Sequence, residues 1–212
     1  MVEPIKLFYE KKGAQLVENL KSRHFEAYYC DSKEEALEKV LSFIPEGSSV
    51  GWGGAMSAQQ VGVMETLAAG NYKVIDRDLA QSPEEREQLM RDCLGADFFL
   101  TGANAISMDG QMVNIDGYGN RCAAIIYGPQ NVIVIAGMNK VTDDLDSAIT
   151  RARTVAAPMN QQRFCKDVPC TVTGTCSDCK SADCICNQML ITRHGRAGGR
   201  IKFIIVGENR GL

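Results

Sequence analysis

The chain has 212 residues, 45% of them hydrophobic, and a formal net charge of −3. A chain of this length can bury roughly 70% of its unfolded surface around one core, so we expect a single domain over residues 1–212. The lysines and arginines are spread along the chain and the balance is acidic, which argues against a basic nucleic-acid-binding surface. We therefore expect no nucleic-acid partner.

The N-terminus does not look like a targeting segment. Met1 to Lys6 carries charges and a proline where a signal peptide needs an apolar run, and no later stretch approaches 18 uninterrupted apolar residues. We expect a soluble, cytoplasmic protein with no membrane partner. Because the cytoplasm keeps thiols reduced, the nine cysteines favour metal or redox chemistry over a disulfide framework.

The first half of the chain alternates between helix and strand signals. Apolar side chains recur at helical spacing early in the chain, and a short aromatic, strand-like run follows them. The expected elements are a helix over 6–23, a strand over 25–30, a helix over 33–43 capped by Asp31 or Ser32, a strand over 49–52, a helix capped by Ser57 that ends near Gly70, and a strand over 72–76.

The second half repeats this alternation. We expect a helix that opens at Ser82-Pro83, a strand over 97–101, one or two inserted β-hairpins over 105–127, a strand over 132–136, a helix from Thr142 or Asp143 to Ala156, and a last strand over 202–206. Strands that alternate with helices imply a mainly parallel α/β sheet with right-handed crossovers.

Ligands of such sheets bind outside the carboxyl ends of the strands, so the polar residues after each strand predict the pocket. Glycines there let the backbone approach an anion, and amides can orient it. The alternative for each residue is ordinary turn chemistry. The candidate ligand-binding residues are Gly53, Gly54, Ser57, Gly102, Asn104, Asn120 and Asn139.

Three charged residues in the same segments are the catalytic candidates. Arg121 could hold a carboxylate or phosphate with two parallel hydrogen bonds. Lys140 could supply a point charge or a Schiff-base amine. Asp116 could act as a base or orient Arg121.

Six of the nine cysteines crowd into residues 158–190, which we interpret as a metal- or cluster-binding segment. Clustered thiolates can converge on one soft cation, whereas isolated cysteines scatter through a core. The loop-rich, asymmetric run is unlike a zinc finger or ribbon, so an iron–sulfur cluster is the first interpretation. Zinc and redox-active or unliganded thiols remain the alternatives.

Several motifs together resemble the LUD family, named for lactate utilisation. They are Thr101-Gly102-Ala103-Asn104-Ala105-Ile106, Asp109-Gly110, Asn114-Ile115-Asp116-Gly117, Gly119-Asn120-Arg121, Gly128-Pro129 and Gly137-Met138-Asn139-Lys140. The resemblance implies a Rossmann-like three-layer sandwich, similar to the sugar-phosphate isomerase and CoA-transferase group. It also implies the oxidation of lactate or a related organic acid, alongside a redox partner protein.

The segment Ala157-Pro158-Met159-Asn160 and the cysteine run resemble a cysteine-bearing branch of that family. Its pattern, P-C-x5-C-x2-C-x6-C-N, implies a cluster, expected to be 4Fe-4S, held by four cysteines. The implied ligands are Cys170, Cys176, Cys179 and Cys186, and the two further thiols, Cys165 and Cys184, are possible alternates.

The leading hypothesis is a LUD-type protein, a redox-linked enzyme or electron-transfer subunit, that binds a small organic acid and carries the cluster. The competing hypothesis is a non-redox isomerase- or hydrolase-like enzyme for a phosphorylated or carboxylated molecule, with structural zinc. A ligand-binding subunit without turnover is the third. A homo-oligomer is compatible with each of them.

Overall fold

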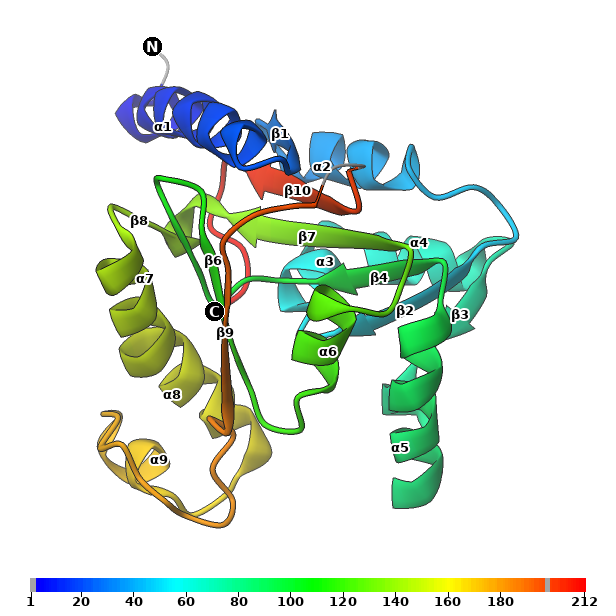
Figure 1. Ribbon diagram of the computed structural model, residues 1–212, viewed down its shortest axis with the longest axis vertical. Coiled ribbons are helices and arrows are strands. Elements are labelled where there is room, and N and C mark those ends of the chain that lie inside the picture. The colour runs from blue at the N-terminus through cyan, green and yellow to red at the C-terminus, as the bar shows by residue number, and fades with distance from the viewer. Residues whose placement is uncertain (1–2, 197–198) are drawn as a thin grey trace.

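The computed structural model describes residues 3–196 and 199–212 (Figure 1). The strands in this part of the chain are β1 (Glu26–Cys30), β2 (Ser49–Gly53), β3 (Lys73–Ile75), β4 (Phe98–Thr101), β5 (Ala105–Ser107), β6 (Met112–Asp116), β7 (Asn131–Gly137), β8 (Val141–Thr142), β9 (Gln188–Thr192) and β10 (Ile201–Val206). The α-helices are α1 (Pro4–Ser22), α2 (Lys33–Leu41), α3 (Met56–Val61), α4 (Val63–Ala69), α5 (Pro83–Asp92), α6 (Asn120–Ile126), α7 (Leu145–Arg151), α8 (Ala157–Gln161) and α9 (Pro169–Thr173).

Six strands of the described residues form one parallel sheet in the order β1-β10-β7-β4-β2-β3. The central strands are buried along both faces, which is why their sequences are continuous apolar runs and not alternating ones. At the centre of the sheet, β4 and β7 are aligned so that Phe99 pairs with Val132 and Leu100 with Ile133. The predicted mainly parallel α/β sheet is confirmed.

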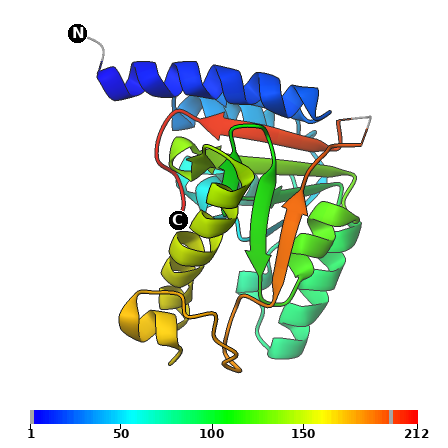
Figure 2. The ribbon, with the colours of Figure 1, turned by 60° about the vertical axis from the view of Figure 1, so that its left-hand side comes forward.

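Helices cover both faces of this sheet and produce three layers (Figures 1 and 2). Successive side chains of a strand point to opposite faces, so Val132 and Val134 pack with α1 and α6, whereas Ile133 and Ile135 pack with α2, α3 and α4. The Rossmann-like architecture that was expected is therefore present. No helix in residues 3–196 or 199–212 combines the length and apolar character needed to cross a membrane.

Short polar side chains start several helices as the sequence predicts. The Ser32 hydroxyl accepts the backbone N–H of Glu35 (3.3 Å), and the Ser82 hydroxyl accepts that of Glu85 (3.1 Å). Each bond satisfies one of the amides that the first turn of a helix leaves unpaired, which stabilises that end by roughly 1 kcal/mol.

The predicted helix that begins with a Ser57 cap and continues to Gly70 is wrong in two respects. Ser57 lies inside α3 and is fully buried, while Ala55 occupies the cap position. Gly62 then adopts a left-handed φ of 90° and divides the segment into α3 and α4. Glycine is the residue that most readily adopts this conformation and ends a helix there.

A second, smaller sheet has the order β8-β5-β6-β9. Strands β5 and β6 form the predicted hairpin, but Asn120–Ile126 is a helix, so a second hairpin there was a wrong expectation. Strand β9 was not predicted. It follows residues 162–187, which hold six cysteines and are called the cysteine segment below, and it pairs antiparallel with β6 (Figure 2). This pairing brings the end of the cysteine segment beside β6.

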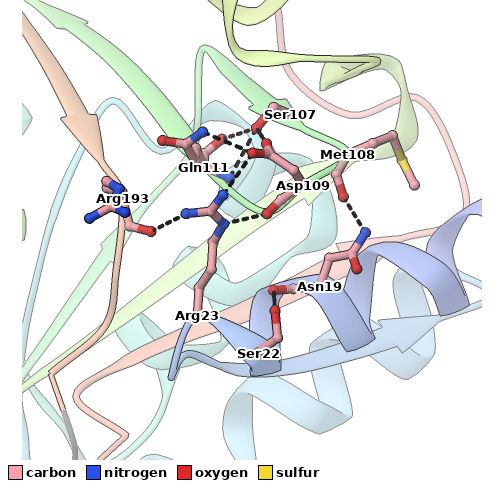
Figure 3. A network of polar contacts seen from close by, with 8 residues as sticks. All are labelled: Asn19, Ser22, Arg23, Ser107, Met108, Asp109, Gln111 and Arg193. Atoms are coloured by element: carbon pink, nitrogen blue, oxygen red, sulfur yellow. Dashed lines mark hydrogen bonds and ion pairs between the residues drawn. The ribbon is translucent and has the colours of Figure 1, made fainter.

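A polar network fixes the β5–β6 turn to the end of α1 (Figure 3). The Arg23 guanidinium donates to the Asp109 carboxylate (2.7 Å) and to the backbone carbonyl of Arg193 (3.2 Å). Burial opposes ionisation of Asp109, but hydrogen bonds from Ser107, Gln111 and Arg23 outweigh it and lower the pKa of this carboxyl. The small sheet is thereby held in place next to the main sheet.

Candidate functional site

A cleft of about 1100 Å³ opens at the carboxyl ends of β2, β3, β4 and β7. The chain passes from β2 outward to β3 and then back across β2 to β4, so β2 and β4 flank the reversal of strand order at which open α/β sheets bind ligands. The structure gathers seven of the ten predicted pocket residues in its wall: Gly53, Gly54, Asn104, Asp116, Asn120, Arg121 and Lys140.

Arg121 lies in the first turn of α6 and is only 8% exposed. Its Nη2 donates to Asn104 Oδ1 (3.3 Å) and to the carbonyl of Ile115. Its Nε is buried without a hydrogen-bond partner among the described residues. Burial lowers the pKa of Arg121, and the nearby Asp116 charge partly counters this. With one edge of the guanidinium fixed by the protein, Nη1 remains for a ligand.

Gly54 allows Arg121 to occupy this position. It has a left-handed φ of 58°, and a β-carbon at residue 54 would overlap Nη1 of Arg121. We predict that Gly54→Ala displaces the guanidinium, destabilises the fold by roughly 1–3 kcal/mol and abolishes anion binding. Thermal unfolding combined with a ligand titration measures both effects. Gly47→Ala is the matched control, since Gly47 has a similar φ of 82° with no atom near its would-be β-carbon.

Asp116 supports Arg121 from the backbone. Its Oδ2 accepts the N–H of Arg121 (2.9 Å) and the N–H of Cys122 (3.1 Å), which are free amides of the first helical turn. Of the two roles predicted for Asp116, this geometry supports orientation of Arg121, because one carboxylate oxygen is already occupied.

The two roles of Asp116 predict different mutant behaviour. If Asp116 positions α6, Asp116→Asn should keep ligand affinity within a few fold, since the amide oxygen can still accept both bonds, whereas Asp116→Ala should cost roughly 1–2 kcal/mol of stability. If it is a general base, Asp116→Asn should abolish turnover with affinity intact. Thermal unfolding and calorimetric titration of both variants separate these outcomes.

Lys140 is the second buried cation of the cleft, at the end of β7. Its Nζ donates to the carbonyl of Ala103 (3.0 Å). Burial, followed by the positive charges of Arg151 and Arg121, lowers the pKa of Lys140 to about 7. The amine therefore exchanges its proton near neutral pH, and an anion placed beside it would favour the charged form.

The other three predicted pocket residues lie behind the cleft wall. The N–H of Gly102 donates to the carbonyl of Gly54 (3.2 Å) and braces that turn. Ser57 Oγ donates to the carbonyl of Arg210 (3.3 Å), and Asn139 Oδ1 accepts the N–H of Arg210 (3.0 Å). Ser57 and Asn139 thus hold the segment after β10 against the site.

That segment was not predicted to take part in the site. The N–H of Gly211 donates to Gln60 Oε1 (2.6 Å), and the α-carbon of Gly211 lies so close to Lys140 Nζ and Ser57 Oγ that a β-carbon would be within 2.6 Å of each. Leu212 lines the cleft. Nothing in the local sequence indicated this contact, because it depends on where β10 ends relative to β7.

Arg151 and Arg77 were also missed. Arg151 Nε donates to the carbonyl of Asn139 (3.0 Å) and Nη1 to the carbonyl of Asn104, which ties the ends of two site segments together. Arg77 begins a short 3-10 turn directly after β3 and lines the cleft. Arg77 lies two residues after the end of β3, so its place at a strand end is the sequence signal that marks it as a pocket residue.

The nine cysteines divide as expected into core and segment. Cys30, Cys93 and Cys122 are buried among apolar side chains, and the other six lie in the segment between α8 and β9. Figure 1 shows this segment at the end of α8 that is remote from the main sheet.

Cys184 and Cys186 of the segment are in direct contact. The N–H of Cys186 donates to Cys184 Sγ (3.4 Å). Burial raises the pKa of Cys170, and the thiols of Cys179, Cys176 and Cys184 raise it further. Cys186 is itself exposed, and its thiol lies near that of Cys184.

Cys165, by contrast, is exposed in a left-handed turn with a φ of 50°. Of the two alternates, the structure therefore places Cys184 next to the predicted ligands. Within the described residues, no three cysteine, histidine, aspartate or glutamate side chains already converge tightly enough to hold a metal ion.

The cysteine segment also forms part of the cleft wall. Asp183, Cys184 and Ile185 line the cleft. Asn187 Nδ2 donates to the carbonyl of Gly117 (3.1 Å), which fixes the segment beside the loop that leads to α6. The buried cations and Cys184 therefore line a common space.

Comparisons with known proteins identify the family and the fold of the chain. The profile of the LUD domain matches residues 13–206. The crystal structure of a DUF162 family protein from Deinococcus radiodurans has a TM-score of 0.55 at 14% identity, covering 93% of this chain and 98% of that chain. At this identity the likeness shows a shared fold.

Two other solved structures are less similar. They are eIF2B delta from Chaetomium thermophilum (TM-score 0.37, 14% identity, 63% of this chain and 54% of that chain) and ribose 5-phosphate isomerase from Plasmodium falciparum (TM-score 0.32, 15% identity, 52% of each chain). No curated protein matches the chain.

Proposed function

Because the chain belongs to the LUD domain family, we propose that it takes part in the oxidation or utilisation of lactate or another small organic acid. In this proposal the acid binds in the strand-end cleft, and the cysteine segment carries an iron–sulfur cluster. The protein would act as a redox-linked enzyme or as an electron-transfer subunit in the cytoplasm, with a redox partner protein.

One observation carries the proposal: two buried cations and the cysteine segment line the same cleft. Arg121 and Lys140 are each less than one-tenth exposed, and Cys184 belongs to the wall that they face. Buried cations are costly unless an anion compensates them. Neither cation forms an ion pair with an acidic side chain of the described residues, so a bound carboxylate would supply the missing charge.

Arg121 and Lys140 would bind the carboxylate of the acid in different ways. Nη1 of Arg121 offers a directed donor beside the Gly53–Gly54 turn after β2, while the Lys140 ammonium provides a compact charge from the turn after β7. When a carboxylate binds, Lys140 takes up a proton, because its pKa of about 7 leaves it only partly charged at neutral pH. Binding of the acid is therefore coupled to proton uptake.

The donor chemistry of the segment fits an iron–sulfur cluster. Cys170, Cys176, Cys179 and Cys186 are the ligands we propose, with Cys184, which contacts Cys186, as the alternate. Thiolates are the usual ligands of such clusters, and a bound cation would relieve the mutual repulsion of the thiolates. When bound, the cluster would supply one-electron transfer at the edge of the cleft.

A second candidate function rests on Lys140. An amine with a pKa of about 7 suits proton transfer or imine formation with a carbonyl compound, neither of which requires electrons to leave the site. In that case the protein is a non-redox enzyme for a carboxylated or phosphorylated molecule, and the cysteines hold structural zinc.

Calorimetric titration with lactate tests the binding step. We expect saturable binding by the wild-type protein, coupled to uptake of a proton near pH 7 and weakened at least tenfold in Lys140→Met. Lys12→Met is the matched control, since Lys12 lies on the surface helix α1 and pairs with Asp143. Failure of lactate and related hydroxy acids to bind, or equal affinity in Lys140→Met, would overturn the proposed site.

A further inference from the structure

Arg77 places a third cation at the outer end of the cleft. It follows β3, which is the edge strand next to β2, whereas Lys140 follows β7. Three strand spacings separate β3 from β7, or roughly 14 Å at about 4.8 Å per strand. Arg121 contacts the turn after β2 and therefore lies between them.

Within the described residues the charge of Arg77 has one loose partner, an ion pair with Asp78. Its side chain donates no hydrogen bond within residues 3–196 and 199–212, and its buried Nε lies 4.0 Å from Asp78 Oδ1, beyond hydrogen-bond range. That carboxylate is instead held by Arg86 Nη1 (2.9 Å). Asp76, the other acid of the turn, accepts the N–H of Asp78 (2.9 Å).

The environment of Arg77 indicates a missing anion. Its side chain is 19% exposed, so most of the guanidinium is removed from water without gaining a close acceptor. Burial lowers the pKa of Arg121, and the positive charge of Arg77, which lines the same cleft, lowers it further. A ligand with negative charge near both groups would offset this effect.

The size of the cleft supports a ligand longer than lactate. About 1100 Å³ lies at the upper end of the range for sites that enclose drug-sized molecules, and a three-carbon monocarboxylic acid would fill only the inner part, next to Arg121 and Lys140. Such an acid would leave the outer part, beside Arg77, without a ligand group.

We propose that the cleft takes a small organic acid with two anionic groups: a carboxylate held by Arg121 and Lys140, and a second carboxylate or a phosphate held by Arg77. This inference rests on the proposed function, because it assigns the substrate class of the same site.

Paired titrations test it. Malate differs from lactate by an added carboxylate, and 3-phosphoglycerate differs from glycerate by an added phosphate. Each pair therefore isolates the effect of the second anionic group. Comparison of the two pairs shows whether that group is a carboxylate or a phosphate. We expect the dianion of at least one pair to bind tenfold to a hundredfold more tightly than its monoanion. Arg77→Gln should remove that advantage and leave the monoanion affinity within about twofold.

Arg91→Gln is the control, because Arg91 lies on α5, is 68% exposed and pairs with Glu87 on the same helix. Arg77→Lys keeps the charge but not the forked donor, and it should retain part of the affinity advantage of the dianion. This variant replaces Arg77→Gln in the test if Arg77→Gln folds poorly. The inference fails, and the proposed function stands, if the affinities are equal within both pairs. The same holds if Arg77→Gln lowers the affinities for monoanion and dianion equally. If no member of either pair binds, the proposed function fails with the inference.

Discussion

Replacement of Lys140 by methionine is expected to make the protein more stable at neutral pH while weakening carboxylate binding at least tenfold. The folded-state pKa of about 7 lies below the ordinary value of 10.5, so the unfolded chain holds more protons across this window. The stability of the wild type should therefore rise as the pH increases from 7 towards 10.5. Below pH 7 the buried charge carries its full cost, on the order of a few kcal/mol.

Lys140→Met removes this cost and loses one hydrogen bond to the carbonyl of Ala103, worth roughly 1 kcal/mol. We expect a net gain of roughly 1–3 kcal/mol at pH 6, falling as the pH rises to 10. Urea unfolding of both proteins between pH 6 and 10 gives the difference in their free energies of unfolding. The contributions of the other titrating groups cancel in this difference. A parallel pH dependence in the two proteins would contradict a buried, partly neutral lysine.

Replacement of Cys186 by serine is expected to abolish cluster loading. A cluster held by four cysteines loses a strong ligand, and serine oxygen is a harder, poorer donor to iron than a thiolate. Iron and acid-labile sulfide of the anaerobically purified protein should fall from near-complete to near zero. We expect the same result for Cys179→Ser.

Two control variants sharpen this prediction. Cys165→Ser should load normally, because Cys165 is exposed in a left-handed turn and is not one of the four proposed ligands. Cys93→Ser changes a buried core cysteine outside the segment. Cys184→Ser decides whether the alternate thiol is a ligand. Loss of iron in Cys165→Ser with full loading in Cys186→Ser would refute the proposed ligand set.

The main sheet could be predicted because its strands are buried on both faces and therefore read as apolar runs, as at Val132–Ala136. Helix starts at Ser32 and Ser82 followed from local capping chemistry. By contrast, β9 depends on pairing with the distant β6, and its half-exposed Gln188–Thr192 run has no strong pattern of its own.

The pocket was predicted in outline but not in its division of roles. Strand-end placement brought Arg121 and Lys140 into one cleft, as the α/β rule requires. The sequence could not show that Ser57 and Asn139 hold the chain after β10, because their partner Arg210 joins them only through the order of the strands. Asp116 likewise looked like a possible base until its bonds to the first turn of α6 were visible.

The most direct test of the central claim is the visible spectrum of the anaerobically purified protein, with iron, sulfide and zinc analysis, before and after addition of lactate. We predict a brown protein that contains iron and sulfide, with a spectrum that changes on addition of lactate, because Cys184 and the buried cations line one cleft. A colourless protein with one zinc per chain would contradict the redox account and favour non-redox chemistry at Lys140.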